Sequence, residues 1–280
     1  MAKALLIVNR DKPEAARTAD SIRAVIARHA EVAEIDAGDE PLSASVAFDV
    51  AVVVGGDGTL IAQTRRLVGH GKPIVGVNAG RLGFLAEFDA ADLERHAGLV
   101  FGAAPPLRQR MLLAVEVEHA GGRRESGSAI NDAVITAGNP HRMIEMALTV
   151  DDDDAGVDIV GDGVIIATST GSTAYNASAG GPIVHPDVGG VIITPICAQS
   201  LAFRPVVVDS RETIALWMRR VNEGTCVVLD GQRQIPLGRG DTVRLTEHAR
   251  KALFVANPSN RYWDALRAKM KWAAPPSYRA

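Results

Sequence analysis

The chain has 280 residues, of which 47% are apolar and 22% are charged. This composition is close to the average for soluble globular proteins, it excludes a collagen, a coiled coil and a disordered chain, and the length predicts two domains or one large one. A formal net charge of -3 removes the electrostatic argument for a nucleic acid or an anionic membrane as the main partner.

The opening hundred residues alternate short apolar runs with helical patterns, as in a parallel sheet with crossover helices. Strands are expected at 4–8, 50–54 and 74–77. Apolar spacing of 3.6 residues predicts a helix at 13–28, and further helices are expected at 59–67, after the turn that follows the second strand, and at 89–99. The Gly- and Pro-containing loop at 102–106 predicts the end of an α/β domain that spans residues 1–104.

From residue 105 to residue 257 the pattern changes to short β-branched segments, which indicate a mostly antiparallel, sandwich-like β-rich domain. A helix is expected near 173–179, and residues 261–272 return to a helical pattern within a final segment, 258–280. The expected strands are 111–117, 129–136, 146–150, 163–168, 191–196, 206–208, 213–217, 226–229, 242–245 and 253–256. The acidic run from Asp151 to Asp154 predicts an exposed hairpin turn, because a calcium loop would need a distal Glu.

We expect a cytoplasmic protein. The apolar stretch at 4–8 is too short for the hydrophobic region of a signal peptide, and no run approaches 18 apolar residues. Cys197 and Cys226 are too far apart for CxxC chemistry, which favours two ordinary buried thiols in a reducing compartment. The seven histidines lack ligand spacing, so no metal site is assigned, and His185 is expected to be structural.

The sharpest local motif is the run Gly55-Gly56-Asp57-Gly58-Thr59, which follows an expected buried strand and precedes an expected helix. Ligands of open α/β sheets bind at this end of the strands, where glycines and a helix N-terminus admit phosphates. A carboxylate at position 57 repels phosphates unless it binds metal or accepts a proton. A tight turn in which Asp57 only caps the helix is the alternative.

Two further motifs contain polar residues suited to a nucleotide. Asn78 opens the run NAGRLGFL after the third strand, on the same expected sheet edge as Gly55. Residues 170–181 place hydroxyls and glycines at the start of a helix, with Tyr175 as a stacking face for a base. Asn131 and Asp132 add polar groups for a nucleoside, although each of these runs also fits a capped turn without a ligand.

Taken in order, these motifs resemble the NAD kinase family. The matching stretches are GGDGTL at 55–60, NAGRLGFL at 78–85, NDAVI at 131–135, DGVIIATSTGSTAYNASAGGPIVHP at 162–186, ITPICAQSLAFRPVVV at 193–208 and DGQ at 230–232. GGDGT alone is shared with phosphofructokinases and with diacylglycerol and sphingosine kinases, whereas the 162–186 block separates the chain from those families.

The resemblance implies transfer of the γ-phosphoryl group of ATP to the 2'-hydroxyl of the adenosine ribose of NAD, giving NADP and ADP. It implies Mg²⁺ or another divalent cation held mainly by the ATP phosphates, a homodimer or homotetramer, and a C-terminal helix that returns to the first domain. Asp57 is implied as the catalytic base. For ATP and its phosphates it implies Gly55, Gly56, Gly58 and Thr59, to which Arg142 is added as a weaker guess for a phosphate contact. For NAD it implies Asp57, Gly58, Phe84, Asn131, Asp132, Asp162, Thr170, Thr173, Ala174, Tyr175, Asn176, Ala177, Ser178 and Gln232.

Some positions depart from the family pattern. Asp132 stands where Glu is frequent, and Val160 stands where many bacterial relatives have a basic residue. Two other functions stay open on the residues alone. One is a lipid or sugar kinase that uses the same GGDGT motif, and the other is a non-catalytic NAD-binding regulator.

Overall fold

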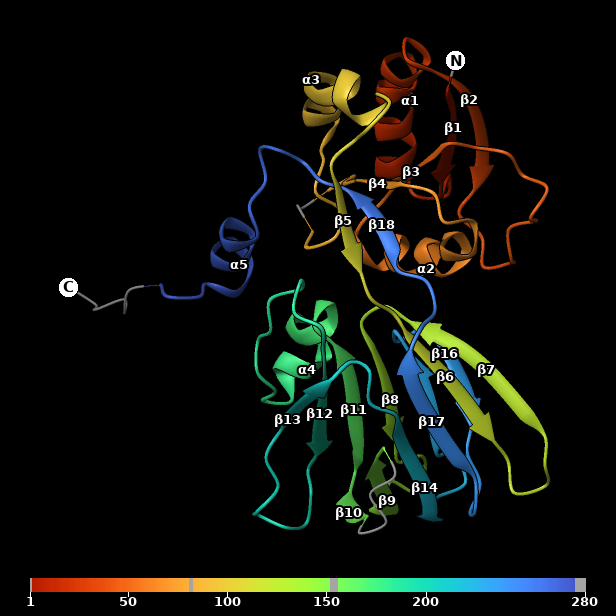
Figure 1. Ribbon diagram of the computed structural model, residues 1–280, viewed down its shortest axis with the longest axis vertical. Coiled ribbons are helices and arrows are strands. Elements are labelled where there is room, and N and C mark those ends of the chain that lie inside the picture. Colours follow the sequence, from red (N-terminus) through yellow and green to blue (C-terminus); the bar gives the residue numbers. More distant parts are fainter. Residues whose placement is uncertain (1, 81–82, 152–155, 275–280) are drawn as a thin grey trace. The chain divides into compact units, whose positions relative to one another are not determined.

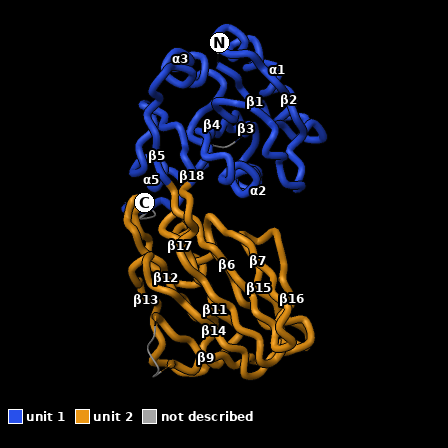
Figure 2. The backbone as a smooth tube through the Cα atoms, turned by 45° about the vertical axis from the view of Figure 1, so that its right-hand side comes forward, with its two compact units in different colours: residues 1–109, 252–280 blue, residues 110–251 orange. Residues whose placement is uncertain are grey.

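The computed structural model describes residues 2–80, 83–151 and 156–274. They form two compact units (Figure 2). Unit 1 comprises residues 1–109 and 252–280, and unit 2 comprises residues 110–251. The chain therefore leaves unit 1, builds unit 2 without interruption, and returns to unit 1.

Unit 1 is built on a six-stranded sheet with the strand order β2-β1-β3-β4-β18-β5 (Figure 1). The pairs β1–β2, β1–β3, β3–β4 and β4–β18 are parallel. The strands are β1 (Ala2–Val8), β2 (Ala30–Asp36), β3 (Val50–Val54), β4 (Ile74–Val77), β5 (Leu107–Arg110) and β18 (Ala252–Val255). The helices are α1 (Pro13–Ala27), α2 (Asp57–Leu67), η1 (Val68–His70), α3 (Ala90–Val100) and α5 (Tyr262–Met270).

Helices cover both faces of this sheet, because successive side chains of a strand point to opposite faces. Ile22 and Ile26 of α1 share one apolar cluster with Val52 and Val54 of β3. On the other face, Leu60 of α2 packs against Gly76, where an added Cβ would lie 2.5 Å from Leu60 Cδ2. The sheet is thus buried on both sides, and its carboxyl edge carries the loops that follow β3 and β4.

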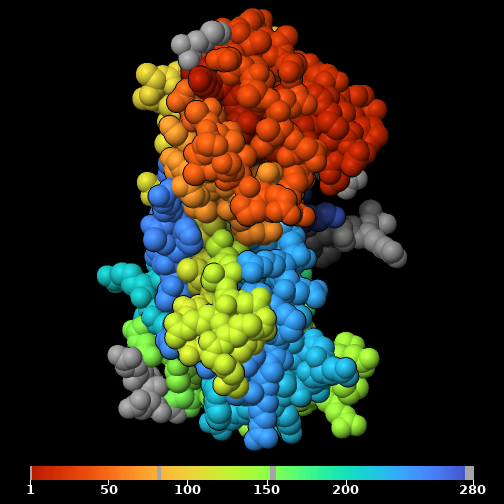
Figure 3. Space-filling model, turned by 90° about the vertical axis from the view of Figure 1, so that its right-hand side faces the viewer, coloured from red at the N-terminus to blue at the C-terminus, as the bar shows by residue number. Residues whose placement is uncertain are grey.

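Unit 2 consists of two antiparallel six-stranded sheets with the orders β10-β9-β14-β17-β6-β7 and β13-β12-β11-β8-β15-β16. One apolar cluster takes residues from both sheets, for example Val115 and Leu216 from the first and Ile135 and Ile166 from the second. The pairing of β6 with β17 and the proximity of β7 to β15 bring distant parts of the chain onto one face of unit 2 (Figure 3).

The elements of unit 2 are β6 (Leu113–Glu118), β7 (Arg124–Ala129), β8 (Asp132–Thr136), β9 (Ile144–Val150), β10 (Val157–Gly161), β11 (Gly163–Thr168), η2 (Thr170–Thr173), α4 (Tyr175–Ser178), β12 (Gly190–Ile196), β13 (Val206–Asp209), β14 (Ile214–Arg220), β15 (Cys226–Leu229), β16 (Arg233–Pro236) and β17 (Thr242–Glu247). On the outer face of the second sheet, Ile165 and Ile192 are covered by Ala179 and Val184. The segment after β11 therefore packs on its own sheet.

The expected fold class, an α/β domain followed by a β-rich domain, is confirmed. Five strands were not expected: β2, β5, β7, β10 and β16. Both β2 (AEVAEID) and β7 (RESGSA) are polar strands at a sheet edge, where only part of each strand is buried. The strand expected at 253–256, as part of the second domain, pairs instead with β4 in the sheet of unit 1.

Three smaller expectations have different outcomes. Of the acidic run, Asp151 follows β9 and accepts a hydrogen bond from the Thr213 amide at 2.7 Å, while Asp152 to Asp154 lie outside the described residues. The expectation of two buried thiols was wrong, because Cys197 is exposed and Cys226 is only partly buried. None of the described helices is long and apolar enough to cross a membrane.

Candidate active site

The glycines of the GGDGT motif lie at the carboxyl edge of the unit 1 sheet. Gly55 directly follows β3 and donates its N–H to Val77 O of β4 at 2.9 Å. A Cβ at Gly55 would lie 2.7 Å from the Thr59 Cβ, so packing requires glycine there. Gly56 and Gly58 are exposed, and a Cβ on either would meet nothing within 4 Å. Packing therefore does not require glycine at these two positions, and their exposed backbone is open to close approach by a ligand.

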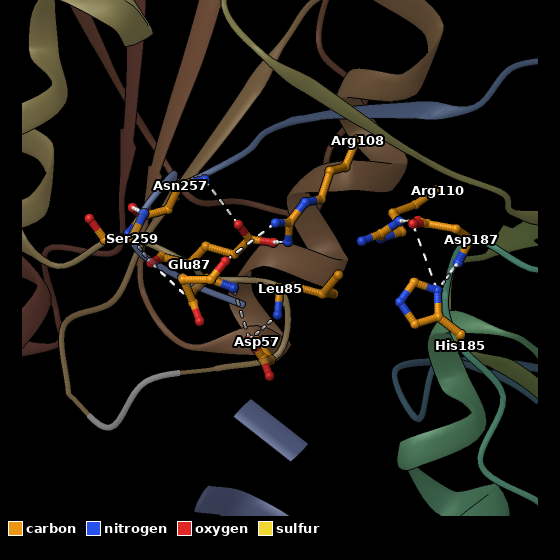
Figure 4. Close-up of polar contacts among 11 residues, drawn as sticks. Asp57, Leu85, Glu87, Arg108, Arg110, His185, Asp187, Asn257 and Ser259 are labelled. Atoms are coloured by element: carbon orange, nitrogen blue, oxygen red, sulfur yellow. Dashed lines mark hydrogen bonds and ion pairs between the residues drawn. The ribbon is translucent and has the colours of Figure 1, made fainter. Parts of the chain in front are cut away.

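Asp57 is the first residue of α2, and its carboxylate is held by the loop that follows β4. Oδ2 accepts the Phe84 N–H at 2.8 Å, and Oδ1 accepts the N–H groups of Leu85 and Ala86, each at 3.1 Å. Figure 4 shows the Asp57 carboxylate beside Leu85. Hydrogen bonds to an ionised acceptor are stronger than neutral ones. Asp57 therefore does more than cap its helix, because two amides of the NAGRLGFL motif and the amide of the residue after it fix its position.

The contact with Asp57 explains a glycine of the NAGRLGFL run. A Cβ at Gly83 would lie only 1.8 Å from Asp57 Oδ1, so the carboxylate occupies the space that a larger residue would need. Asn78 Oδ1 accepts the Gly80 N–H at 2.9 Å. In the part of the chain that the structure describes, the buried Asn78 Nδ2 has no hydrogen-bond partner. Arg81 and Leu82 lie outside the described residues.

A second group of motif residues meets at one end of the sheet that contains β8, β11 and β15. The Thr168 N–H donates to Asn131 O at 2.8 Å, and a Cβ at Gly171 would lie 2.1 Å from the same oxygen. Asp230 follows β15 and accepts N–H groups from Ile130 at 3.1 Å and Asn131 at 2.8 Å. The NDAVI, TSTGST and DGQ motifs, the last including Gln232, thus form one cluster in unit 2.

Asp132 is the most perturbed acid of this cluster. Its side chain is buried, with a residue exposure of 5%. Burial, and then the nearby Asp230 carboxylate, raise the pKa of Asp132 to about 7. Asp132 is therefore a carboxyl group that changes charge near neutral pH.

The segment from Thr170 to Ser178 combines a structural residue with available groups. Asn176 is fully buried, its Nδ2 donates to Ser172 O and Pro182 O at 3.0 Å each, and its Oδ1 accepts from Thr194 Oγ1 at 2.7 Å. That side chain is used inside the protein. By contrast, the buried Thr170 Oγ1 has no hydrogen-bond partner among the described residues, and Tyr175 is 49% exposed. Thr173, Ala174 and Ala177 are partly buried, and Ser178 is exposed.

Two of the expected residues lie away from this cluster. Asp162 precedes β11, whereas Thr168 ends it, and six residues of strand separate them by about 20 Å. Arg142 is exposed in the loop after β8, at the end of that strand opposite Asn131. The N–H of Ala137, which directly follows β8, donates to Asp162 O at 2.8 Å. Asp162 and Arg142 therefore both belong to the end of the sheet opposite Asn131.

The histidine of the 162–186 block and the candidate metal-binding side chains lie outside these two clusters or do not converge. His185 Nδ1 accepts the Asp187 N–H at 3.3 Å, and Asp187 pairs with Arg110 at 2.6 Å (Figure 4), so His185 has a local structural contact. Within residues 2–80, 83–151 and 156–274, no three His, Cys, Asp or Glu side chains converge as metal ligands do. The described residues therefore do not fit a metal held by the protein alone.

The chain matches two family descriptions in order along its length. Residues 38–101 match the ATP-NAD kinase N-terminal domain, and residues 130–257 match the ATP-NAD kinase C-terminal domain. An NAD kinase of Geobacter sulfurreducens is 39% identical over 84% of this chain and 82% of that protein. The chain belongs to the NAD kinase family.

Other relatives agree with this assignment. An NAD kinase of Symbiobacterium thermophilum is 34% identical over 96% of this chain and 99% of that protein. The crystal structure of an Archaeoglobus fulgidus NAD kinase in complex with ATP has a TM-score of 0.74 at 26% identity, covering 96% of this chain and 98% of that one. Yeast NADH kinase complexed with NADH has a TM-score of 0.83 at 23% identity, covering 99% and 89%, which shows the shared fold. The family assignment favours an NAD kinase over a lipid or sugar kinase or a regulator.

Replacing Gly83 by Ala will displace the Asp57 carboxylate, because the new Cβ would overlap Oδ1 at 1.8 Å. If Asp57 takes part in the reaction, NADP formation falls by at least about tenfold, since small displacements of a reacting group are costly. Gly80→Ala is the matched control from the same loop, because its Cβ would lie an ordinary 3.7 Å from Glu14 Oε2. Equal rates for the two variants would contradict the role given to Gly83.

Asp132 will make the protein less stable as the pH rises. Its pKa, raised to about 7 in the native state, exceeds the ordinary carboxyl value of 3.8, so between these pH values the unfolded chain releases the proton first. The free energy of unfolding then falls by up to about 1.4 kcal/mol per pH unit and levels off above about pH 7. Urea unfolding at a series of pH values should show this slope in the wild type and a shallower one in Asp132→Asn. Parallel slopes would contradict it.

Proposed function

We propose that the protein transfers the γ-phosphoryl group of ATP to the 2'-hydroxyl of the adenosine ribose of NAD, with Asp57 as the group that accepts the hydroxyl proton. The observation that carries this proposal is the Asp57 carboxylate, fixed by the amides of Phe84, Leu85 and Ala86. A base must be held within hydrogen-bond reach of the hydroxyl, and a carboxylate with a fixed position meets that requirement.

In this reaction the hydroxyl oxygen forms a bond to the γ-phosphorus while the bond from that phosphorus to the β–γ bridging oxygen breaks. The electron pair of the broken bond leaves with ADP, and the hydroxyl proton moves to an Asp57 oxygen. Phosphoryl transfer depends mainly on positioning and on stabilising negative charge. The exposed backbone of Gly56 and Gly58, together with Gly55 and Thr59, would position the phosphates. The positive end of the α2 dipole would stabilise their negative charge.

We propose the following residues as NAD contacts. In unit 1 these are Asp57, Gly58 and Phe84. In unit 2, support comes from the buried Thr170 hydroxyl without a hydrogen-bond partner among the described residues, and from the exposed ring of Tyr175. The remaining proposed residues are Asn131, Asp132, Asp162, Thr173, Ala174, Asn176, Ala177, Ser178 and Gln232; Arg142 stays a proposed phosphate contact. Asn176 would act by holding the turn that presents its neighbours.

Magnesium enters the proposal as part of the ATP substrate. Because the described residues do not gather three metal-binding side chains, the ATP phosphates would hold the ion. When bound, it neutralises phosphate charge.

Asp57→Asn should keep the fold and lose the reaction. An amide cannot accept the hydroxyl proton, and general base catalysis contributes about 10²- to 10⁴-fold to a rate. We expect NADP formation from NAD and ATP-Mg to fall by that factor, measured with an enzymatic cycling assay for NADP. Asp39→Asn, which changes an exposed acid in the same unit, is the control and should retain the wild-type rate. Wild-type turnover in Asp57→Asn would remove Asp57 from its proposed role.

We also propose a homodimer or homotetramer. The edge strand β13 exposes Val206 and Val207 at 49% and 48%, and nearby Leu201 is 89% exposed. An edge strand with exposed apolar side chains is a place where a second chain can pair or pack. Light scattering should give a mass of two or four chains, and a stable monomer would contradict this proposal.

A further inference from the structure

Lys269 brings a positive charge to Asp57 from a distant part of the chain. Its Nζ lies 3.6 Å from Asp57 Oδ2 and 4.9 Å from the centroid of the Phe84 ring. Phe84 also donates its N–H to Asp57 Oδ2. The Lys269 ammonium group therefore lies close both to the Asp57 carboxylate and to Phe84, whose amide helps to hold that carboxylate in place.

The position of Lys269 follows from the face of helix α5 on which it lies. Ala265 and Leu266 are the buried residues of this helix, and Lys269 follows them by four and three positions, so all three share one face. The Lys269 side chain is 31% exposed, whereas that of Arg267, two residues earlier, is 65% exposed. The helix thus directs one cation inward and one outward.

The segment before α5 is fixed to the loop that holds Asp57. Glu87 follows Phe84, Leu85 and Ala86 in the chain, and its Oε2 accepts the Asn257 N–H at 3.0 Å. Asn257 Nδ2 donates in return to Glu87 O at 2.8 Å, and Arg108 pairs with Glu87 Oε1 at 2.5 Å (Figure 4). One loop therefore positions both Asp57 and the segment that leads to Lys269.

Stability alone does not explain this arrangement. A partly exposed Lys–Asp pair contributes little to folding, because water solvates both charges well. A cation held beside the proposed base has a clearer use in phosphoryl transfer, where the negative charge of the transferred group must be stabilised.

We propose that Lys269 binds the phosphoryl group as it is transferred, and then the 2'-phosphate of the product. This inference rests on the function proposed above. Before the reaction Lys269 pairs with the Asp57 carboxylate. When Asp57 takes the hydroxyl proton its charge is neutralised, while the new phosphate ester forms on the oxygen that was hydrogen bonded to it. That oxygen lies about 3 Å from the carboxylate, so its phosphate oxygens come within reach of the Lys269 ammonium.

The test compares Lys269→Gln, Lys269→Arg and the matched control Arg267→Gln, which removes the outward cation of the same helix. For Lys269→Gln we expect kcat to fall about 100-fold, as when one transition-state donor is removed. Calorimetry should show the Kd for NADP raised about tenfold, the loss of one charged hydrogen bond, with the Kd for NAD within about twofold. Lys269→Arg should recover most of both losses because it keeps the charge, and Arg267→Gln should match the wild type.

Two results would overturn this inference. One is a wild-type kcat in Lys269→Gln. The other is an equal change in the affinities for NAD and NADP, which would indicate that Lys269 only supports the helix. Thermal unfolding of the variants identifies a folding defect, and Lys269→Arg then carries the test. If the wild-type protein makes NADP while Lys269→Gln is unaffected, only this inference fails; if the wild type makes none, the proposed function fails.

Discussion

The arrangement of the two loops at the carboxyl edge of the unit 1 sheet depends on one interaction, the hydrogen bonding of the Asp57 carboxylate by the amides of residues 84–86. A carboxylate repels the phosphates for which this loop is suited. Its negative charge is therefore best stabilised by hydrogen-bond donors of the protein that do not also bind the ligand. The parallel pairing of β3 and β4 places the two loops on the same sheet edge. The absence of a side chain at Gly83 then gives the carboxylate room.

Unit 2 uses the same device at a different place. Asp230, like Asp57, precedes a glycine, and its carboxylate accepts the amides of Ile130 and Asn131 from a neighbouring strand start. In both units an acidic side chain from one motif orders the backbone of another. At Asp132, burial and then the ordered Asp230 carboxylate disfavour a second negative charge, which raises the pKa of Asp132.

The sequence was sufficient for the parts that depend on local pattern. The apolar run VAVVV, the glycines after it and the ordered motifs predicted the α/β unit and the β-rich unit, and they singled out Asp57, whose catalytic role stays a prediction. The rest depends on contacts between distant residues. Backbone amides carry no sequence signal, so the partners of Asp57 were not foreseen, and β2 and β7 are polar because they lie at sheet edges. In the sequence, Lys269 looks like any other surface cation of an amphipathic helix, although it lies beside Asp57. Asn176 was expected to contact the ligand, although its side-chain amide is hydrogen bonded inside the protein.

The interrupted course of unit 1 has a consequence for how the protein is made. Strand β18 and helix α5 come from residues 252–270, whereas the rest of the unit comes from the first 109 residues. During translation, at about 5–20 residues per second, unit 2 can emerge and fold while the first sheet still lacks a strand between β4 and β5. The nascent chain therefore carries Asp57 without Lys269 until ribosomes have translated helix α5, and products terminated before that helix lack this charge altogether.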